Sequence, residues 1–183
     1  MSLNTVAAVD VGGTTIKGAV VDITGQVLRE RARPTPAAAG PEAVIAALLE
    51  LIEELTAERN ADATVAPVRA VGVVVPGAVD AWAGRAVFSA NLGFRDVPLR
   101  QIVAGATGLP TVLEHDVRAA GVAERELGAT AGVDDHLLAV IGTGIAAVIE
   151  SGGRPVPGAS QIAGELGHIP VWPGGELCSC GQR

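Results

Sequence analysis

The order of apolar and polar positions along the chain predicts an alternation of strands and helices. Apolar runs of strand length lie at 6–11 and 16–22, and a third strand is expected within 23–33. Because tight turns separate these runs, they predict three antiparallel strands. Residues 41–59 carry apolar side chains at helical spacing, with Pro41 in the first turn, and therefore predict a helix.

The pattern beyond the first helix extends the same alternation. A continuous apolar run at 68–77, ended by Pro–Gly, predicts a strand buried on both faces. Further elements follow as a helix over 98–108, a strand over 110–116, a helix over 117–128 and two strands around a glycine turn within 136–154. This order predicts an α/β fold with a mixed sheet. Since a strand–glycine turn–strand pattern opens the chain and recurs after residue 130, we expect one α/β domain over 1–130 and the start of a second over 131–183.

Composition narrows the function classes. Of 183 residues, 49% are apolar, which is enough for a substantial core, and the net charge is −7. An acidic chain is a poor partner for nucleic acid or an anionic membrane, although the same charge also simply favours solubility. No leader pattern or membrane-length apolar run is visible, so a cytoplasmic protein is expected. Cys178 and Cys180 stand one residue apart, a spacing that favours a metal site over a disulfide.

The stretch "DVGGTTIK" (10–17) forms a first glycine loop after a predicted strand. Glycines leave backbone amides open to a phosphate, and a carboxylate at a strand end can hold Mg²⁺ through water. The spacing matches neither a P-loop nor a dinucleotide fingerprint, and a polar β-turn is the alternative. The residues predicted to bind phosphate here are Asp10, Gly12, Gly13, Thr14, Thr15 and Lys17.

Two further features complete a possible phosphoryl-transfer site. A second glycine loop contains Gly142, Thr143 and Gly144; it is either half of a nucleotide site or a hairpin turn. Asp116 stands where a strand gives way to a helix, the edge at which α/β sheets place ligands. Its carboxylate could accept a proton from an attacking hydroxyl, or it could only cap the helix that follows.

Together these pieces resemble the ROK family of sugar kinases and repressors, within the wider actin/Hsp70/sugar-kinase (ribonuclease H-like) fold. The resemblance rests on "DVGGTTIKGAVVD", on "GTGIAAV" and above all on "AGELGHIPVWPGGELCSCG" at 163–181. It covers essentially the whole chain. It implies a first domain that is complete and a second domain that is only partly present.

The resemblance implies roles for individual residues. Asp116 matches a catalytic base that deprotonates a sugar hydroxyl, and both glycine loops match nucleotide-binding segments. Residues matching the sugar site are Gly77, Asn91, His115, Asp116, Glu165 and His168, and those matching ligands of a structural zinc are His168, Cys178 and Cys180. The implied cofactors are ATP, Mg²⁺ and Zn²⁺, with a zinc site that is incomplete in this chain because zinc needs four ligands.

The sequence departs from the family pattern at its end, around the predicted base and in "GTGIAAV", where the family often has more glycine. It stops at "CSCGQR", before a third cysteine and the rest of the second domain that the resemblance implies, so we expect a truncated protein with little kinase activity of its own. His115 stands where the family usually has asparagine, and Arg118 where a small or polar residue is usual. Both changes bear on the choice of sugar.

The resulting hypothesis is an ATP-dependent kinase that phosphorylates glucose or an N-acetylhexosamine, with Asp116 as general base; polyphosphate stays open as donor. The alternatives are a non-catalytic sugar-binding protein and the remnant of a ROK-type transcriptional regulator. An acidic chain with its first strand at about residue 6 argues against the regulator. The expected partners are the sugar and ATP, with no nucleic acid or membrane, and the family resemblance allows a homodimer.

Overall fold

The structure is a computed structural model that describes residues 5–57, 66–142, 144–172, 174–178 and 181–183. The chain divides into two compact units, Met1–Asp116 and Val117–Arg183. Each unit is described by itself below. The expected domain division after residue 130 would group the helix that begins at Asp116 with the first unit, whereas nearly all of that helix lies in the second.

A five-stranded mixed sheet forms the first unit. Its strands are β1 (Thr5–Val11), β2 (Thr15–Asp22), β3 (Val27–Pro34), β4 (Val68–Val75) and β8 (Thr111–His115), in the spatial order β3-β2-β1-β4-β8. Strands β1, β2 and β3 pair antiparallel, while β4 pairs parallel with both β1 and β8. The predicted antiparallel strands and mixed sheet are confirmed.

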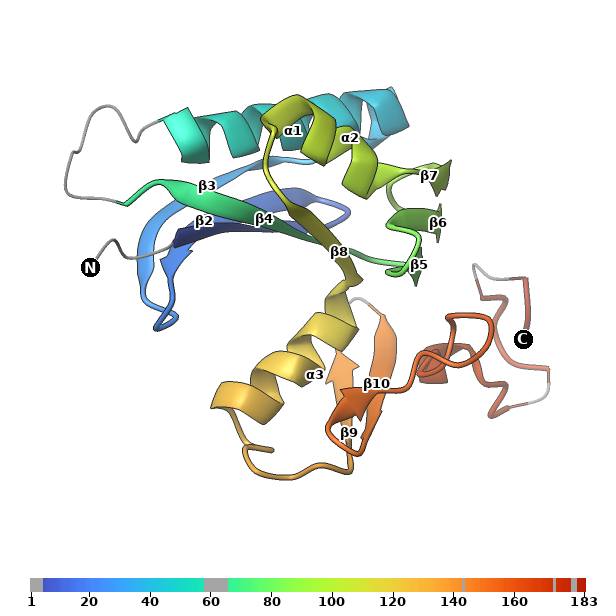
Figure 1. The fold of residues 1–183 in the computed structure, drawn as a ribbon. Coiled ribbons are helices and arrows are strands. Elements are labelled where there is room, and N and C mark those ends of the chain that lie inside the picture. Colours follow the sequence, from blue (N-terminus) through green and yellow to red (C-terminus); the bar gives the residue numbers. More distant parts are fainter. Residues whose placement is uncertain (1–4, 58–65, 143, 173, 179–180) are drawn as a thin grey trace. The chain divides into compact units, whose positions relative to one another are not determined.

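Helices α1 (Pro41–Ala57) and α2 (Leu99–Thr107) cover one face of this sheet, after a short 3-10 turn, η1 (Ala37–Ala39) (Figure 1). Both helices lie where the apolar spacing predicted them. The buried side chains alternate along each strand, as in Ala7, Val9 and Val11 of β1, and meet Leu48, Leu51 and Leu55 of α1. The core therefore lies between the helices and one face of the sheet.

The opposite face of the sheet is not covered by any helix of the described first unit. Val6 of β1 is 38% exposed and Val112 of β8 is 67% exposed. The prediction that residues 68–77 are buried on both faces is wrong for this structure: β4 ends at Val75, and Gly72 and Val74 on the open face are only half-buried. A continuous apolar run indicates that both faces of a strand are apolar, but it does not indicate whether a helix covers each face.

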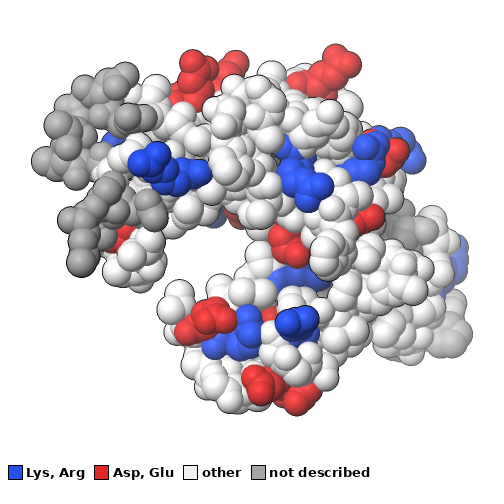
Figure 2. All heavy atoms as spheres, viewed as in Figure 1, with Lys and Arg blue, Asp and Glu red and all other residues white. Residues whose placement is uncertain are grey.

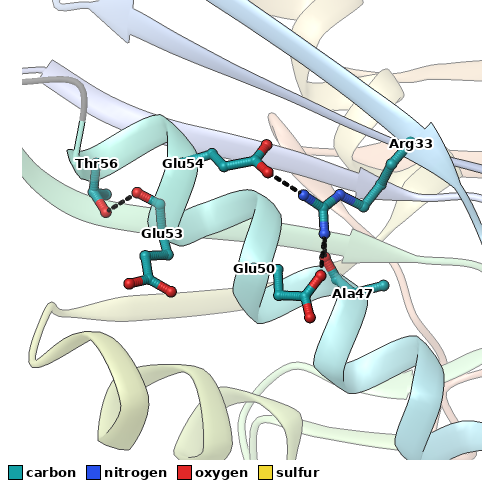
Figure 3. Close-up of polar contacts among 6 residues, drawn as sticks. All are labelled: Arg33, Ala47, Glu50, Glu53, Glu54 and Thr56. Carbon is teal, nitrogen blue, oxygen red and sulfur yellow. Dashed lines mark hydrogen bonds and ion pairs between the residues drawn. The ribbon is translucent and has the colours of Figure 1, made fainter.

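Arg33 ties the edge strand β3 to α1 (Figure 3). Its guanidinium donates to the carboxylates of Glu50 at 2.7 Å and Glu54 at 2.5 Å, and to the carbonyl of Ala47 at 3.2 Å. Glu50 and Glu54 are one helical turn apart, so a single planar cation can reach both. Since both carboxylates are more than half exposed, the contribution to stability is modest.

A small antiparallel sheet was missed by the sequence analysis. It consists of β5 (Ala78–Asp80), β6 (Arg85–Ser89) and β7 (Phe94–Val97), which follow β4 directly. Phe94 and Ser89, which are register partners where β6 and β7 are connected, are buried. Strands of three to five residues contain too few positions to show a period-two pattern, so the sequence provides little signal for them.

The second unit contains most of α3 (Asp116–Leu127), then β9 (His136–Ile141), β10 (Ile145–Ser151), β11 (Arg154–Pro155) and η3 (Leu166–His168). The three strands form an antiparallel sheet in the order β11-β10-β9, as the predicted strand–turn–strand pattern requires. Helix α3 packs on β10 through Gly121, where a Cβ atom would overlap Val148. Only glycine allows the helix to approach the strand this closely.

Charged side chains are scattered rather than gathered by sign. On the face drawn in Figure 2, acidic groups lie over the position of α1, and the basic groups there form several separate clusters. Among the described residues, no helix is long and apolar enough to cross a membrane.

Candidate functional site

The first unit brings its predicted site residues to one edge of the sheet. Because β1, β4 and β8 are parallel neighbours, their carboxyl ends share this edge. The glycine loop follows β1, Gly77 follows β4, and Asp116 follows β8. This is the edge at which open α/β sheets bind ligands.

The first glycine loop has a fixed backbone. The amide of Gly12 donates to the carbonyl of Thr15 at 3.0 Å, and the hydroxyl of Thr35 donates to the carbonyl of Gly12 at 2.6 Å. The amide of Thr35 also donates to the carbonyl of Thr14 at 2.9 Å. Thr35 therefore positions the loop from the end of β3. The sequence analysis did not single out Thr35, because a lone threonine in a loop carries no motif.

Gly13 and Gly77 pack so closely against neighbouring residues that a side chain would have little or no room. A Cβ atom on Gly13 would lie 3.2 Å from the Cβ of Asn91, so this loop residue lies against the predicted sugar-site residue Asn91. Gly77 has a φ of +103° and packs on the backbone of Phe88, where a side chain would overlap the carbonyl. Asn91 is itself exposed. The loops after β1, β4 and β6 therefore meet around these residues.

Asp10 and Asp116 interact electrostatically although they are far apart in the sequence. Burial raises the pKa of Asp10 above its ordinary value, and the negative charge of Asp116 raises it further, while Lys17 lowers it. Lys17 lies directly across from Asp10 in the β1–β2 register. A groove of about 480 Å³ on the open face of the sheet includes Asp10, Lys17 and Val74 in its lining. A pair of acidic side chains beside a lysine is chemistry suited to phosphate and a divalent cation.

Replacing Asp10 with asparagine is expected to stabilise the protein at neutral pH. A carboxyl whose folded pKa is raised binds its proton more tightly in the native state than in the unfolded state, so its contribution to stability is lost as pH rises through that pKa. The Asp10→Asn variant should melt at a higher temperature than the parent at pH 7, and the two should converge below pH 4. Thermal denaturation followed by circular dichroism across pH checks this. A lower melting temperature at pH 7 would contradict the expectation.

His115 and Asp116 form a direct contact at the end of β8. The Nδ1 of His115 lies 3.2 Å from Oδ1 of Asp116, and the two side chains are 11% and 36% exposed. His115 shares the helix-covered face of the sheet with Leu113, and its register partner in β4 is Val75. The sequence analysis placed His115 in the sugar site; the structure shows it beside the predicted base.

The second glycine loop connects β9 to β10. Ile141 and Ile145 are register partners, and the amide of Gly142 donates to the carbonyl of Gly144 at 2.9 Å. Thr143 lies outside the described residues. Neither glycine has a left-handed φ, and a Cβ atom on either would have no neighbour within 4 Å. The turn and its packing therefore tolerate a side chain at both positions, and what glycine adds is bare backbone that a ligand can approach.

The segment "AGELGH" is anchored to β10. The amide of Ala147 donates to the carbonyl of Gly164 at 2.7 Å, and a Cβ atom on Gly167 would overlap the carbonyl of Ile145. The two glycines of the motif thus allow the chain to lie against the strand. This contact fixes η3, and with it Glu165 and His168, on the second unit.

His168 stands between a carboxylate and a thiol. Its Nδ1 lies 3.6 Å from Sγ of Cys178, and its Nε2 lies 3.7 Å from Oε2 of Glu165. Cys180 lies outside the described residues. Within the described residues, no three His, Cys, Asp or Glu side chains form a metal-binding group. The predicted sugar residues are therefore divided, with Gly77, Asn91, His115 and Asp116 in the first unit and Glu165 and His168 in the second.

The comparisons with known proteins show which family the chain belongs to. The ROK family model matches residues 6–183. The chain belongs to the ROK family. A ROK family glucokinase from Streptomyces griseus, solved with glucose and AMPPNP, is 33% identical, with a TM-score of 0.86 over 98% of this chain and 55% of that one. The predicted family and the actin/Hsp70/sugar-kinase fold are therefore confirmed.

Other ROK relatives have different functions. N-acetylmannosamine kinase from Citrobacter koseri is 36% identical over 179 residues, which are 96% of this chain and 58% of that protein. A ROK family transcriptional regulator, described as a homologue of the E. coli MLC protein, is 29% identical, with a TM-score of 0.87 over 97% of this chain and 44% of the regulator. The chain spans about half the length of the curated relatives it matches. Sugar phosphorylation is the activity that most of these names share.

Proposed function

We propose that this chain is part of an ATP-dependent kinase that phosphorylates a hydroxyl of a hexose, either glucose or an N-acetylhexosamine. Asp116 acts as general base: it takes the proton of the sugar hydroxyl as that oxygen bonds to the γ-phosphorus of ATP. The bond from the γ-phosphorus to the bridging oxygen breaks, and ADP leaves. Candidate sugar-binding residues lie in each unit, Gly77 and Asn91 in the first and Glu165 and His168 in the second.

One observation carries the proposal. Asp116 follows β8 at the carboxyl edge of the parallel strands, close enough to Asp10 for its charge to raise the pKa of that carboxyl. The base thus lies at the same edge of the sheet as the first glycine loop, which would receive the phosphates.

Each unit carries one glycine loop suited to a phosphate donor. Asp10, Lys17 and the backbone of Gly12 to Thr15 are suited to the triphosphate and its Mg²⁺, which neutralises charge developing on the transferred group. The backbone of Gly142 and Gly144 is accessible to a ligand, because a Cβ atom at either position would have no neighbour within 4 Å. Positioning and charge stabilisation then supply most of the rate enhancement. Use of ATP fits the cytoplasmic location that the sequence predicts.

The test is turnover across a sugar panel. The protein that carries residues 1–183, at its full natural length, is assayed for ADP release with hexoses and N-acetylhexosamines. Replacing ATP with inorganic polyphosphate tests the alternative donor. One sugar that drives ATP turnover with saturable kinetics supports the proposal, whereas binding of sugars without any phosphoryl transfer would overturn it.

A second candidate, a sugar-binding regulator, is favoured by the close structural likeness to the ROK transcriptional regulator. The same sugar panel distinguishes the two candidates. A regulator would bind sugars without phosphorylating them, and it would also bind DNA. The net charge of −7 argues against DNA contact by the residues described here.

We also propose a structural zinc site at His168, Cys178 and Cys180. A tetrahedral zinc with a nitrogen at about 2.0 Å and a sulfur at about 2.3 Å places these two ligands about 3.5 Å apart. The separation of 3.6 Å between Nδ1 of His168 and Sγ of Cys178 fits that spacing. Bound zinc would fix the segment that carries Glu165.

Replacing Cys178 with serine is expected to weaken zinc binding at least tenfold, because a thiolate ligand is lost. Equilibrium dialysis against a zinc chelator, with metal measured by mass spectrometry, gives the affinity. Glu176→Gln, an exposed carboxylate in the same segment, is the matched control and should bind as the parent does. Equal zinc content in the Cys178→Ser variant and the parent would refute the site.

A further inference from the structure

We propose that His115 is a positioning residue for Asp116, and that it acts by donating a hydrogen bond from Nδ1 rather than by contacting the sugar. The inference rests on the proposed kinase function, since it assigns the group that orients the base. The observation on which the inference rests does not depend on that function: Nδ1 of His115 lies 3.2 Å from Oδ1 of Asp116.

The surroundings of His115 fix the ring. The residue is 9% exposed and is the last residue of β8, so its backbone is held by the sheet beside Val75. The carboxylate of Glu114 also accepts a hydrogen bond from the backbone amide of His115 at 2.7 Å. A side chain on so constrained a backbone, mostly removed from water, can hold a neighbour in one orientation.

The partner determines which ring nitrogen carries the proton. An ionised carboxylate only accepts, so the contact with Oδ1 requires the proton on Nδ1. The hydrogen bond then restrains rotation of the carboxylate at the first residue of α3. A base held in this way spends more of its time in the productive orientation.

Asparagine reproduces this donor. Its Nδ2 is bonded to Cγ, as Nδ1 is in histidine, so it can reach the same oxygen of Asp116. Phenylalanine keeps the ring and removes the donor. The pair of variants therefore separates the hydrogen bond from the packing of the ring.

The kinetic test compares His115→Phe and His115→Asn with the parent protein, at its full natural length, under saturating ATP and the preferred sugar. We expect the phenylalanine variant to lose about tenfold to hundredfold in kcat, with KM for the sugar within about twofold. The asparagine variant should recover most of that loss. A rise in KM at constant kcat, or no recovery with asparagine, would overturn the inference.

A second test needs no activity. The chain has three histidines, so the imidazole of His115 can be followed by NMR through a pH titration. An adjacent carboxylate favours the protonated ring, so the pKa of His115 should fall in Asp116→Asn. An unchanged pKa of His115 would refute the contact. Since this result does not depend on turnover, it separates failure of the inference from failure of the proposed function.

Discussion

Replacing Asp116 with asparagine is expected to lower sugar-dependent kcat by about a thousandfold, within the range that general bases contribute. Asparagine keeps the size of the side chain and an acceptor oxygen for His115, but it cannot take the proton of the sugar hydroxyl. Sugar binding should persist, because the neighbouring polar groups remain. Steady-state kinetics with the preferred sugar, together with calorimetric measurement of sugar affinity, test both parts.

The control for this variant is Asp96→Asn. Asp96 is an exposed acid of β7 whose partner is Arg85 at 2.6 Å, and it is not one of the candidate site residues. Its removal takes away one carboxylate without touching the carboxyl edge of β1, β4 and β8, so kcat should stay within about twofold of the parent. Retained kcat in Asp116→Asn would overturn the assignment of Asp116 as the general base, although the protein would still be a kinase.

The sequence predicted the main elements because their patterns are long. The apolar spacing of α1 extends over 17 residues, and the continuous apolar run of β4 extends over 8. Patterns of this length are enough to distinguish a helix from a strand. The pattern could not indicate which face of the sheet is covered by helices. Val112 is apolar like its buried neighbour Leu113, yet it is 67% exposed. Strands β5, β6 and β7 were missed because they are too short to show an alternating pattern.

The candidate site was predicted one segment at a time. Glycine loops and a strand-end aspartate are visible in the sequence, but the approach of Asp10 to Asp116 results from the parallel pairing of β1, β4 and β8. Likewise, Thr35 acquires its role only because β3 returns to the first loop. His115 was predicted to contact sugar because it stands where the family usually has asparagine; its contact with Asp116 had to come from the structure.

The largest expected loss of stability comes from replacing Arg125 with methionine. Glu150 of β10 has a fully buried side chain, and its Oε2 lies 3.1 Å from Nε of Arg125 on α3. Without the guanidinium, a carboxylate would remain in the interior of the second unit with no countercharge. Breaking a buried pair in this way costs about 3–5 kcal/mol. Urea denaturation followed by circular dichroism should show a midpoint lowered accordingly.

Three further results decide whether burial of Glu150 is the cause. Glu126→Gln removes the exposed carboxylate that also contacts Arg125, at 2.9 Å, and should cost less than about 1 kcal/mol. The double variant Arg125→Met with Glu150→Met should recover most of the stability, because it buries no charge. The loss in Arg125→Met should also shrink as pH falls, since an unpaired buried carboxyl folds more readily when it is protonated. If Arg125→Met and Glu126→Gln prove equally stable, the buried pair does not hold α3 on β10, and the glycine contact at Gly121 must carry that packing alone.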